Sequence, residues 1–499
     1  MSFLGVDVGT GGSRAVVIDD AGAVRAQATA AHAPFATPHT GWSEQSPEDW
    51  WRAASETIRS VVAAVSADDI RAVSFSGQMH GSVFLDENNA VIRPALLWND
   101  QRTAPQVERL KAMIGDTRII EMVANPAITG FTLPKLLWLR ENEPENWSRV
   151  CSVLLPKDYV RLGLTGEKAC DVADASGTLM FDVRNRCWSD KMLSAVDVDV
   201  DLLPKVVESI ASAGVVSEAG SKATGLKVGT PVFAGSGDNA AGAIGAGLVS
   251  PGTLGATIGT SGVVFVVTDK PTFDPKGRTH SLCHAIPNRW HMTGVTLAAG
   301  HSLKWFRDIF ALDVAYDELT AEAAKAPAGS NGLIWQPYLM GERSPHMNPF
   351  ARASFTGISS GLHRGHFVRA IMEGVAFSLR DSIEIFRSLG APINEIRLGG
   401  GGASSPLWRQ IQADVYGQTV STLEADEGAA FGAALIAGVG IGAWPSVEAA
   451  VGETVNISEN VEPNLDDSAV LETSYQRFKS LYPALKDTAN TEKKNEQQF

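Results

Sequence analysis

An aspartate stands where a strand is expected to end and a helix to begin. Segment 232–242 reads VFAGSGDNAAG, an apolar run, a turn of small residues, and an Ala/Gly-rich helix starting near Asp238. A helix N-terminus favours negative charge, so we expect the carboxylate of Asp238 to be ionised. Such a carboxylate can take the proton of a bound hydroxyl as its oxygen attacks an electrophile. An aspartate that only caps the helix fits the local sequence equally well.

A second candidate is the glycine-rich turn 9–14, which reads GTGGSR and follows the strand expected over 3–8. Glycines let the backbone approach an anion, while Thr10 and Ser13 supply hydroxyls. The turn is not a Walker A loop, because the chain has no Gly-Lys-Ser/Thr and the turn leads into a strand, expected over 15–18. Taken alone, it is just as typical of a tight hairpin.

The motif around the first turn is repeated in the second half of the chain. Segment 4–12 reads LGVDVGTGG and segment 254–262 reads LGATIGTSG. Two copies at the starts of two equal halves predict duplicated domains, each opening with a strand, a glycine turn and a strand. Only the first copy has a carboxylate at its strand end, because Asp7 corresponds to Thr257. This asymmetry favours a metal at the first turn and neutral phosphate contacts at the second; chance similarity of two turns is the alternative.

Four successive glycines occupy 399–402, after a strand expected over 396–398 and before a helix expected over 407–415. We interpret this loop as a nucleotide contact, with a crowded helix–strand junction as the alternative. Segment 235–240 also formally matches the G-x-G-x-x-A dinucleotide fingerprint, and 399–404 matches its glycines with Ser404 in the last position. Asp238 would then repel the pyrophosphate, and no acidic residue follows at the usual spacing, so we disfavour an oxidoreductase.

The elements that must position these groups belong to an α/β protein. Strand-like runs alternate with helical ones, of which 47–65 is the first, and 499 residues suffice for two large domains. We predict an N-terminal domain over 1–248, a C-terminal domain over 249–485, and a disordered polar tail over 486–499. The apolar run 429–444 is short and rich in Ala and Gly, so we expect a buried helix rather than a membrane span.

Charge and cysteine content narrow the function further. The formal net charge of -14 disfavours nucleic acid and anionic membranes as partners. ATP would need local devices such as glycine turns, helix N-termini and a metal ion. The four cysteines form no C-x-x-C pair, and the N-terminus has no basic, apolar leader, so we expect reduced thiols in the cytoplasm.

Two polar loops suit a polyhydroxylated ligand, whose hydroxyls must all be paired once water leaves. One carries Gln78, Met79 and His80, and the other runs over 98–102 (WNDQR). By themselves these loops assign no role. Taken together, the motifs resemble, in order from about 3 to 450, the FGGY carbohydrate kinases. The motifs are GVDVGT (5–10), GQMHG (77–81), WND (98–100), LPKDY (155–159), GDNAAG (237–242), GTSG (259–262) and the glycines from 399.

The resemblance implies two ribonuclease H-like domains, of the actin and sugar-kinase type, around a nucleotide- and sugar-binding cleft. It implies ATP and Mg²⁺ as cofactors, Asp238 as proton acceptor, and Asp7 as a second catalytic residue near the metal. The residues expected to bind the sugar are Met79, His80, Asp100, Asp238 and Asn239. Those expected to bind the nucleotide are Gly9, Thr10, Gly11, Thr260, Gly300, Gly401 and Gly402.

The reaction implied by the resemblance is transfer of the γ-phosphate to the C5 hydroxyl of D-xylulose, which the Met79–His80 pair favours. Another polyol or ketose, such as ribulose, arabitol or glycerol, is the alternative substrate. A non-catalytic, ATP-binding sugar sensor would be expected to lack Asp7 or Asp238, and both are present. Arg14 stands where many members have lysine, which keeps the charge but changes its geometry. By analogy, a homodimer is expected.

Overall fold

The computed structural model describes residues 1–424 and 428–489, which form two compact units interleaved along the chain. The first unit comprises 1–250, 268–291 and the described part of 425–455; the second comprises 251–267, 292–424 and the described part of 456–499. One change of unit lies between Ser250 and Pro251, two residues beyond the predicted end of the N-terminal domain at 248. The chain is nevertheless not divided at a single point, because two later segments return to the first unit.

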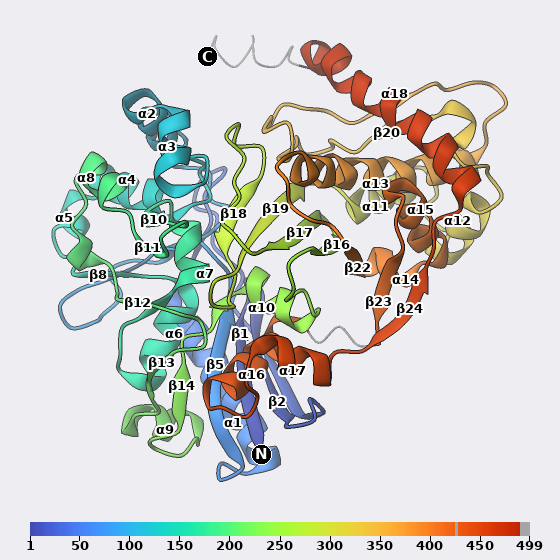
Figure 1. Cartoon of the computed structure of the whole chain (residues 1–499). Helices are drawn as coiled ribbons and strands as arrows, with labels where there is room; N and C mark the ends of the chain where they lie inside the picture. Colours follow the sequence, from blue (N-terminus) through green and yellow to red (C-terminus); the bar gives the residue numbers. More distant parts are fainter. Residues whose placement is uncertain (425–427, 490–499) are drawn as a thin grey trace. The chain divides into compact units, whose positions relative to one another are not determined.

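The first unit is built on a mixed sheet of order β13-β14-β5-β1-β2-β3, with β15 also paired to β5 (Figure 1). Strand β1 runs antiparallel to β2 and parallel to β5. The expected strands over 3–8 and 15–18 therefore form the predicted hairpin. The strands are β1 (Ser2–Val8), β2 (Gly12–Asp19), β3 (Val24–Ala31), β5 (Ile70–Gly77), β13 (Ser212–Val215), β14 (Pro231–Phe233) and β15 (Ser236–Gly237).

Both faces of this sheet are buried, as the alternation of side chains along β1 requires. Leu4, Val6 and Val8 pack in a cluster with helix α1 (Pro47–Val65), which has the bounds predicted for it. Phe3 packs on the other face with helices α10 (Asp238–Gly245) and α16 (Gly428–Gly440). Helix α16 comes so close to β1 that a Cβ at Gly5 would lie 1.9 Å from the carbonyl oxygen of Ala430.

This contact explains why 428–455 rejoins the first unit. Helix α16 is apolar on nearly all sides and is almost wholly buried. Such a helix has to be covered on every side, and strand β1 covers one of them. The buried helix expected in the apolar run from 429 is confirmed. Among the described residues, no helix is long and apolar enough to cross a membrane.

The second unit repeats the opening topology of the first. Strand β16 pairs antiparallel with β17 across the second glycine turn and parallel with β22, as β1 does with β2 and β5. The duplication predicted from 4–12 and 254–262 is thus confirmed in the strand pairing. The sheet order in this unit includes β19-β17-β16-β22-β23-β24, formed by β16 (Thr253–Ile258), β17 (Gly262–Thr268), β19 (Trp290–Thr296), β22 (Glu395–Gly399), β23 (Val420–Leu423) and β24 (Ile457–Val461).

The other main elements complete the two units. In the first unit they are β6 (Val83–Leu85), α2 (Ala104–Ile114), α3 (Asp116–Val123), α4 (Thr132–Asn142), β8 (Ser152–Leu154), α6 (Pro156–Thr165), α7 (Val172–Ala175), α8 (Asp190–Val196), α9 (Glu218–Thr224) and α17 (Val447–Thr454). In the second they are α11 (Gly300–Phe310), α12 (Tyr316–Ala323), α13 (Arg364–Ser388), α14 (Gly401–Ser404), α15 (Pro406–Tyr416) and α18 (Leu465–Ala489). Helix α18 runs into the expected polar tail, whose last part, 490–499, lies outside the described residues.

Candidate active site

Two carboxylates lie at one end of the first sheet, on either side of strand β5. In the strand register, both Asp7 of β1 and Ser236 of β15 are partners of Ser76 in β5. Asp238 follows β15 directly as the first residue of α10. Two strand spacings separate β1 from β15, about 10 Å between their backbones. The fold therefore gathers the two predicted catalytic residues at one edge, although they are far apart in sequence.

The turn before Asp238 is possible only with small residues. Gly235 has φ 75°, and a Cβ there would lie 1.9 Å from the carbonyl oxygen of Phe75. This close approach brings β15 alongside β5 and starts α10 at the sheet edge. The predicted position of Asp238, between a strand end and a helix start, is confirmed.

The electrostatics of Asp238 differ from the sequence-based expectation. The pKa of Asp238 is raised to about 7, first by burial and then by the like charge of Asp7. The N–H of Asn239 donates to its Oδ1 at 2.7 Å and lowers the pKa. The helix N-terminus thus acts in the expected direction, but burial and repulsion outweigh it. A base that gains and loses its proton near neutral pH is well matched to general-base catalysis.

Asp7 is held by its neighbours in the sheet. The hydroxyl of Ser76 donates to its Oδ1 at 2.9 Å, and Arg14 is its cross-strand partner. Burial raises the pKa of Asp7, while Ser76 and Arg14 lower it. Sequence reasoning missed Ser76, because only the parallel pairing of β1 with β5 places its hydroxyl beside Asp7.

The first glycine turn is fixed from three sides around Thr10. The hydroxyl of Thr10 donates to Oε1 of Gln78 at 3.0 Å and accepts from the indole N–H of Trp98 at 3.1 Å. The amide of Gln45 donates to its carbonyl. Space beside Gly11 is open, since a Cβ there would meet nothing within 4 Å. Nucleotide binding by Gly9, Thr10 and Gly11 stays a prediction.

Three of the expected sugar-binding residues lie on the two segments that follow β5 and β15. Nδ2 of Asn239 lies 3.6 Å from Sδ of Met79. Nδ1 of His80 lies 2.7 Å from the carbonyl oxygen of Gly177, and the backbone of His80 is left-handed with φ 69°. These side chains come from the loop after β5 and the first turn of α10. The structure thus brings Met79, His80 and Asn239 to the same edge as the two carboxylates.

Gly237, directly before Asp238, packs against the side chain of Met79. A Cβ at Gly237 would lie 2.6 Å from Cγ and 2.9 Å from Sδ of Met79. We expect Gly237→Ala to displace Met79 and to raise KM for the sugar about tenfold, with KM for ATP unchanged. Gly242→Ala in the same helix is the control, because a Cβ there meets nothing within 4 Å. Equal sugar KM values for the two variants would contradict this role of Gly237.

Asp100, also expected to contact the sugar, is fully buried and already engaged. Its Oδ2 accepts the N–H of Ser43 at 2.7 Å, and both of its oxygens accept from the guanidinium of Arg102. In this arrangement Asp100 fixes the loop that carries Trp98. The structure does not bring Asp100 into the group around Asp238, so its sugar contact stays a prediction.

In the second unit the expected nucleotide-binding residues converge on 258–260. The carbonyl of Thr260 accepts from the N–H groups of Ala299 and His301, and the N–H of Gly300 donates to Gly259. Gly400 has φ 70°, and a Cβ at Gly402 would lie 2.5 Å from Cβ of Ile258. Thr260, Gly300, Gly401 and Gly402 therefore share one neighbourhood. The glycines do not open the helix expected over 407–415, because the short α14 intervenes and Ser405 caps α15.

The residues at the first turn fit a magnesium ion of the kind that phosphate-transfer enzymes use. Mg²⁺ is usually held by one or two carboxylates together with substrate phosphates and water. Asp7 supplies such a carboxylate beside the open glycine turn. Within 1–424 and 428–489 there is no cluster of three His, Cys, Asp or Glu residues that could hold a metal by itself. The single carboxylate of Asp7 thus fits a metal ion that is also bound by the phosphates of a nucleotide.

Comparison with known proteins identifies the class. Residues 2–245 match the N-terminal domain model, and residues 254–441 the C-terminal domain model, of the FGGY family of carbohydrate kinases. The chain belongs to this family, as the motif resemblance indicated. It is 39% identical over 486 residues to the xylulose kinase of Bacillus subtilis, covering 97% of each chain. It is 40% identical over 436 residues to that of Escherichia coli, covering 87% of this chain and 89% of that one.

Solved structures agree with this assignment. The xylulose kinase from Rhodospirillum rubrum superposes with a TM-score of 0.93 at 27% identity, covering 98% of this chain and 100% of that chain. The glycerol kinase from Plasmodium falciparum, at 20% identity and a TM-score of 0.89, shares the fold over 97% of this chain and 98% of that chain. The expected α/β fold of the actin and sugar-kinase type, and the assignment as a carbohydrate kinase, are confirmed.

Proposed function

We propose that this carbohydrate kinase phosphorylates D-xylulose at its C5 hydroxyl, with Mg-ATP as phosphoryl donor. The observation that carries the proposal is Asp238, a carboxylate with a pKa near neutrality beside Met79 and Asn239. The near full-length similarity to xylulose kinases from two bacteria supports the choice of sugar. Binding of D-xylulose by Met79, His80, Asp238 and Asn239 is part of the proposal.

The chemistry follows from the positions of the two carboxylates. Asp238 takes the proton of the C5 hydroxyl while the sugar oxygen forms its bond to the γ-phosphorus and the bond from that phosphorus to the bridging oxygen of ADP breaks. Phosphoryl transfer depends chiefly on positioning and on neutralisation of charge. Bound Mg²⁺ would supply that neutralisation. Asp7 would hold the ion, with Ser76 keeping its carboxylate in place.

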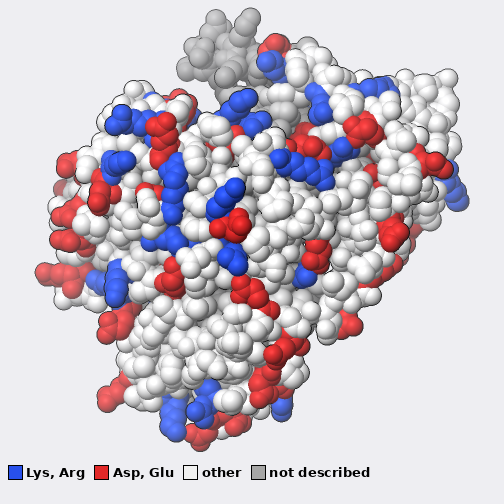
Figure 2. Space-filling view, viewed as in Figure 1, with Lys and Arg blue, Asp and Glu red and all other residues white. Residues whose placement is uncertain are grey.

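Nucleotide binding is assigned to the glycine-rich groups of both units. Acidic and basic side chains are interspersed over the face shown in Figure 2. Because the chain has a net charge of -14, we expect backbone N–H groups and the metal to do most of the binding of a polyphosphate. The turn at Thr260 with Gly300, Gly401 and Gly402, and the turn at 9–11, are the proposed sites. A cytoplasmic location, suggested by the free cysteines among the described residues, and a homodimer complete the proposal.

A substrate panel tests the function. ADP release from Mg-ATP is measured with D-xylulose, D-ribulose, L-ribulose, D-arabitol, glycerol or no sugar. We expect kcat/KM for D-xylulose to exceed that for every other acceptor by about 100-fold or more, the scale set by unpaired polar groups when a wrong sugar binds. Preference for another polyol would move the specificity and keep the mechanism. Absence of any sugar-dependent turnover would refute the proposed function.

A further inference from the structure

His80 has a main-chain conformation that is uncommon for a residue with a side chain, although histidine adopts it more often than most residue types. Its φ of 69° lies in the left-handed region, which costs free energy for a residue with a Cβ and persists only where neighbours impose it. The ring is also held, because Nδ1 faces the carbonyl oxygen of Gly177 at 2.7 Å. A carbonyl can only accept, so Nδ1 carries the hydrogen in this contact. Both the main chain and the ring of His80 are thus fixed by neighbouring groups.

The main chain of His80 is held by one helix. Nζ of Lys135 donates to the carbonyl oxygen of His80 at 2.8 Å, and the hydroxyl of Thr132 donates to the same oxygen at 3.1 Å. Both residues lie on α4, three positions apart, so they share one face of the helix. Phe131, directly before this helix, packs its ring against that of His80, with centroids 4.9 Å apart.

Lys135 is a buried lysine whose amine binds two main-chain carbonyls. Its side chain is fully buried, and Nζ also donates to the carbonyl oxygen of Gly130 at 2.7 Å. Burial lowers the pKa of Lys135 to about 7, against the opposing charge of Asp100. A neutral amine keeps two hydrogens, one for each carbonyl, so the hold on His80 does not depend on the charge. In either protonation state, the buried Lys135 side chain joins the carbonyls of Gly130 and His80 and so holds this loop in place.

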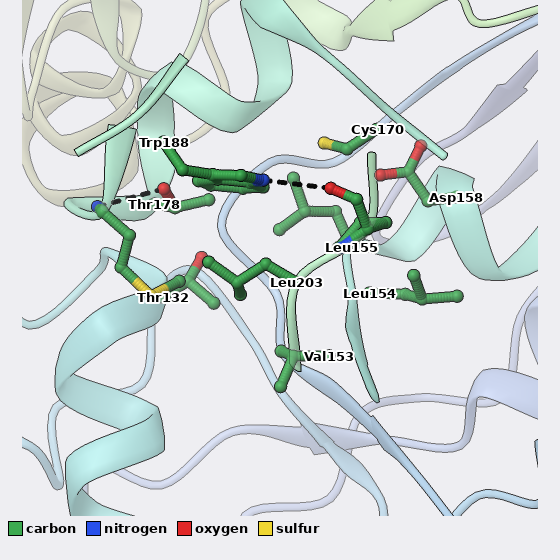
Figure 3. A pocket seen from close by; sticks show the side chains of 11 residues that line it. Thr132, Val153, Leu154, Leu155, Asp158, Cys170, Thr178, Trp188 and Leu203 are labelled. Atoms are coloured by element: carbon green, nitrogen blue, oxygen red, sulfur yellow. Dashed lines mark hydrogen bonds between the residues drawn. The ribbon is translucent and has the colours of Figure 1, made fainter. Parts of the chain in front are cut away.

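Thr132 also forms part of the packing behind the loop. It lines a small cavity of ≈ 10 Å³ together with Asp158, Cys170 and Thr178, and Figure 3 shows these side chains around it. The cavity is about the size of one water molecule, and residues 132–139 of α4 are buried. The hydrogen-bond donors to His80 are thus carried by a firmly packed element.

We propose that Lys135 and Thr132 are positioning residues that impose the left-handed backbone of His80, and thereby aim Nε2 of its ring at one hydroxyl of the sugar. The inference rests on the proposed sugar site and adds to it the residues that set its selectivity. Neither residue is a contact of the sugar itself. Their effect on the reaction passes through His80.

The test is a double-mutant cycle between Lys135→Met and His80→Ala. Methionine is unbranched and only one heavy atom shorter than lysine, and it has no donor. We expect Lys135→Met to raise KM for D-xylulose about 10- to 100-fold, with KM for ATP and kcat changed less than threefold, because two buried carbonyls lose their donor and the loop that carries His80 is no longer held. In the His80→Ala background the same change should raise KM by less than about threefold, because the ring it positions is gone.

Thr132→Val is the second variant and keeps the inference testable if Lys135→Met does not fold. We expect about a 3- to 10-fold rise in sugar KM, as for one neutral hydrogen bond. Thr57→Val in α1 is its matched control, since that buried hydroxyl donates to a carbonyl of its own helix at 2.9 Å. Three results would overturn the inference. They are an equal loss of affinity for ATP and sugar, a Lys135→Met effect on sugar KM that is as large in the His80→Ala background as in the wild type, and an unchanged sugar KM in both variants.

Failure of this inference can be told apart from failure of the proposed function. The substrate panel is run first on the wild-type protein, and the cycle then uses whichever sugar gives the highest kcat/KM. A preference for another polyol would refute the choice of D-xylulose and leave the cycle intact. If the wild type phosphorylates D-xylulose and the two substitutions act independently of each other, the role of Lys135 is refuted and the function stays intact.

Discussion

Replacing Asp238 with asparagine is expected to lower kcat for D-xylulose by about 100- to 10,000-fold, the range that a positioned general base contributes. Asparagine keeps an oxygen that can accept the N–H of Asn239, which donates to Asp238 at 2.7 Å, so the start of α10 should persist. KM for the sugar should change little, because proton transfer is needed only in the transition state. Steady-state kinetics with both substrates varied measures the effect.

Asp190→Asn is the matched control, since Asp190 is also the first residue of a helix, α8, and is exposed. It should keep wild-type kinetics. Turnover by Asp238→Asn within about tenfold of the wild type would rule out Asp238 as the base, since the loss would fall below the contribution of general-base catalysis.

The raised pKa of Asp238 gives this prediction a pH dependence. The base must be ionised, so wild-type kcat/KM should fall about tenfold per pH unit below the pKa of about 7 and level off above it. The folded-state pKa lies above the value of about 3.9 expected for an unfolded aspartate. The folded state therefore binds the proton more tightly, and ionisation of Asp238 costs stability as pH rises. Melting temperatures should show Asp238→Asn to be more stable than the wild type at pH 8, with the difference vanishing below about pH 4.

Replacing Asp7 with asparagine is the second large effect. The amide oxygen can still accept from Ser76, so the fold of β1 is expected to persist, but the charge that would hold Mg²⁺ is removed. We expect kcat to fall about 100-fold or more and the Mg²⁺ concentration for half-maximal activity to rise about tenfold, as for loss of a charged metal ligand. Initial rates over a Mg²⁺ titration measure both quantities.

The same variant reports on the coupling of the two carboxylates. Asp7 raises the pKa of Asp238 by repulsion, and Asp7→Asn removes this repulsion. The fall of kcat/KM towards acid pH should therefore begin at a lower pH in Asp7→Asn than in the wild type. Asp20→Asn, at an exposed position just after β2, is the control and should leave the Mg²⁺ requirement unchanged. A normal Mg²⁺ requirement in Asp7→Asn would assign the metal to other groups.

Much of the local structure could be predicted, because neighbouring residues decide it. Helix α1 has its predicted bounds, since its apolar residues recur at helical spacing and form one buried face. The junction before Asp238 could be predicted from its small residues, because Gly235 allows a positive φ and a close approach to β5. The duplicated turns predicted a repeated topology, and the pairing of β1 and β16 with their neighbours confirms it.

The site could be predicted only in part. Asp7, Met79, His80, Asp238 and Asn239 were identified from motifs, and they meet at one edge of a sheet. Asp100 was assigned to the sugar by the same comparison, yet its oxygens are taken by Ser43 and Arg102. Lys135 carried no local signal, since its partners are main-chain carbonyls that any sequence offers.

The sequence by itself determined the family, the strand–turn–strand units and the candidate for the base, because these depend on residue type and short spacing. Only the tertiary structure decided that 428–455 returns to the first unit, since an apolar helix can be covered by any sheet with a matching surface. It also decided the proton affinity of Asp238. That affinity depends on burial and on Asp7 across β5, and both arise from strand pairing between distant segments.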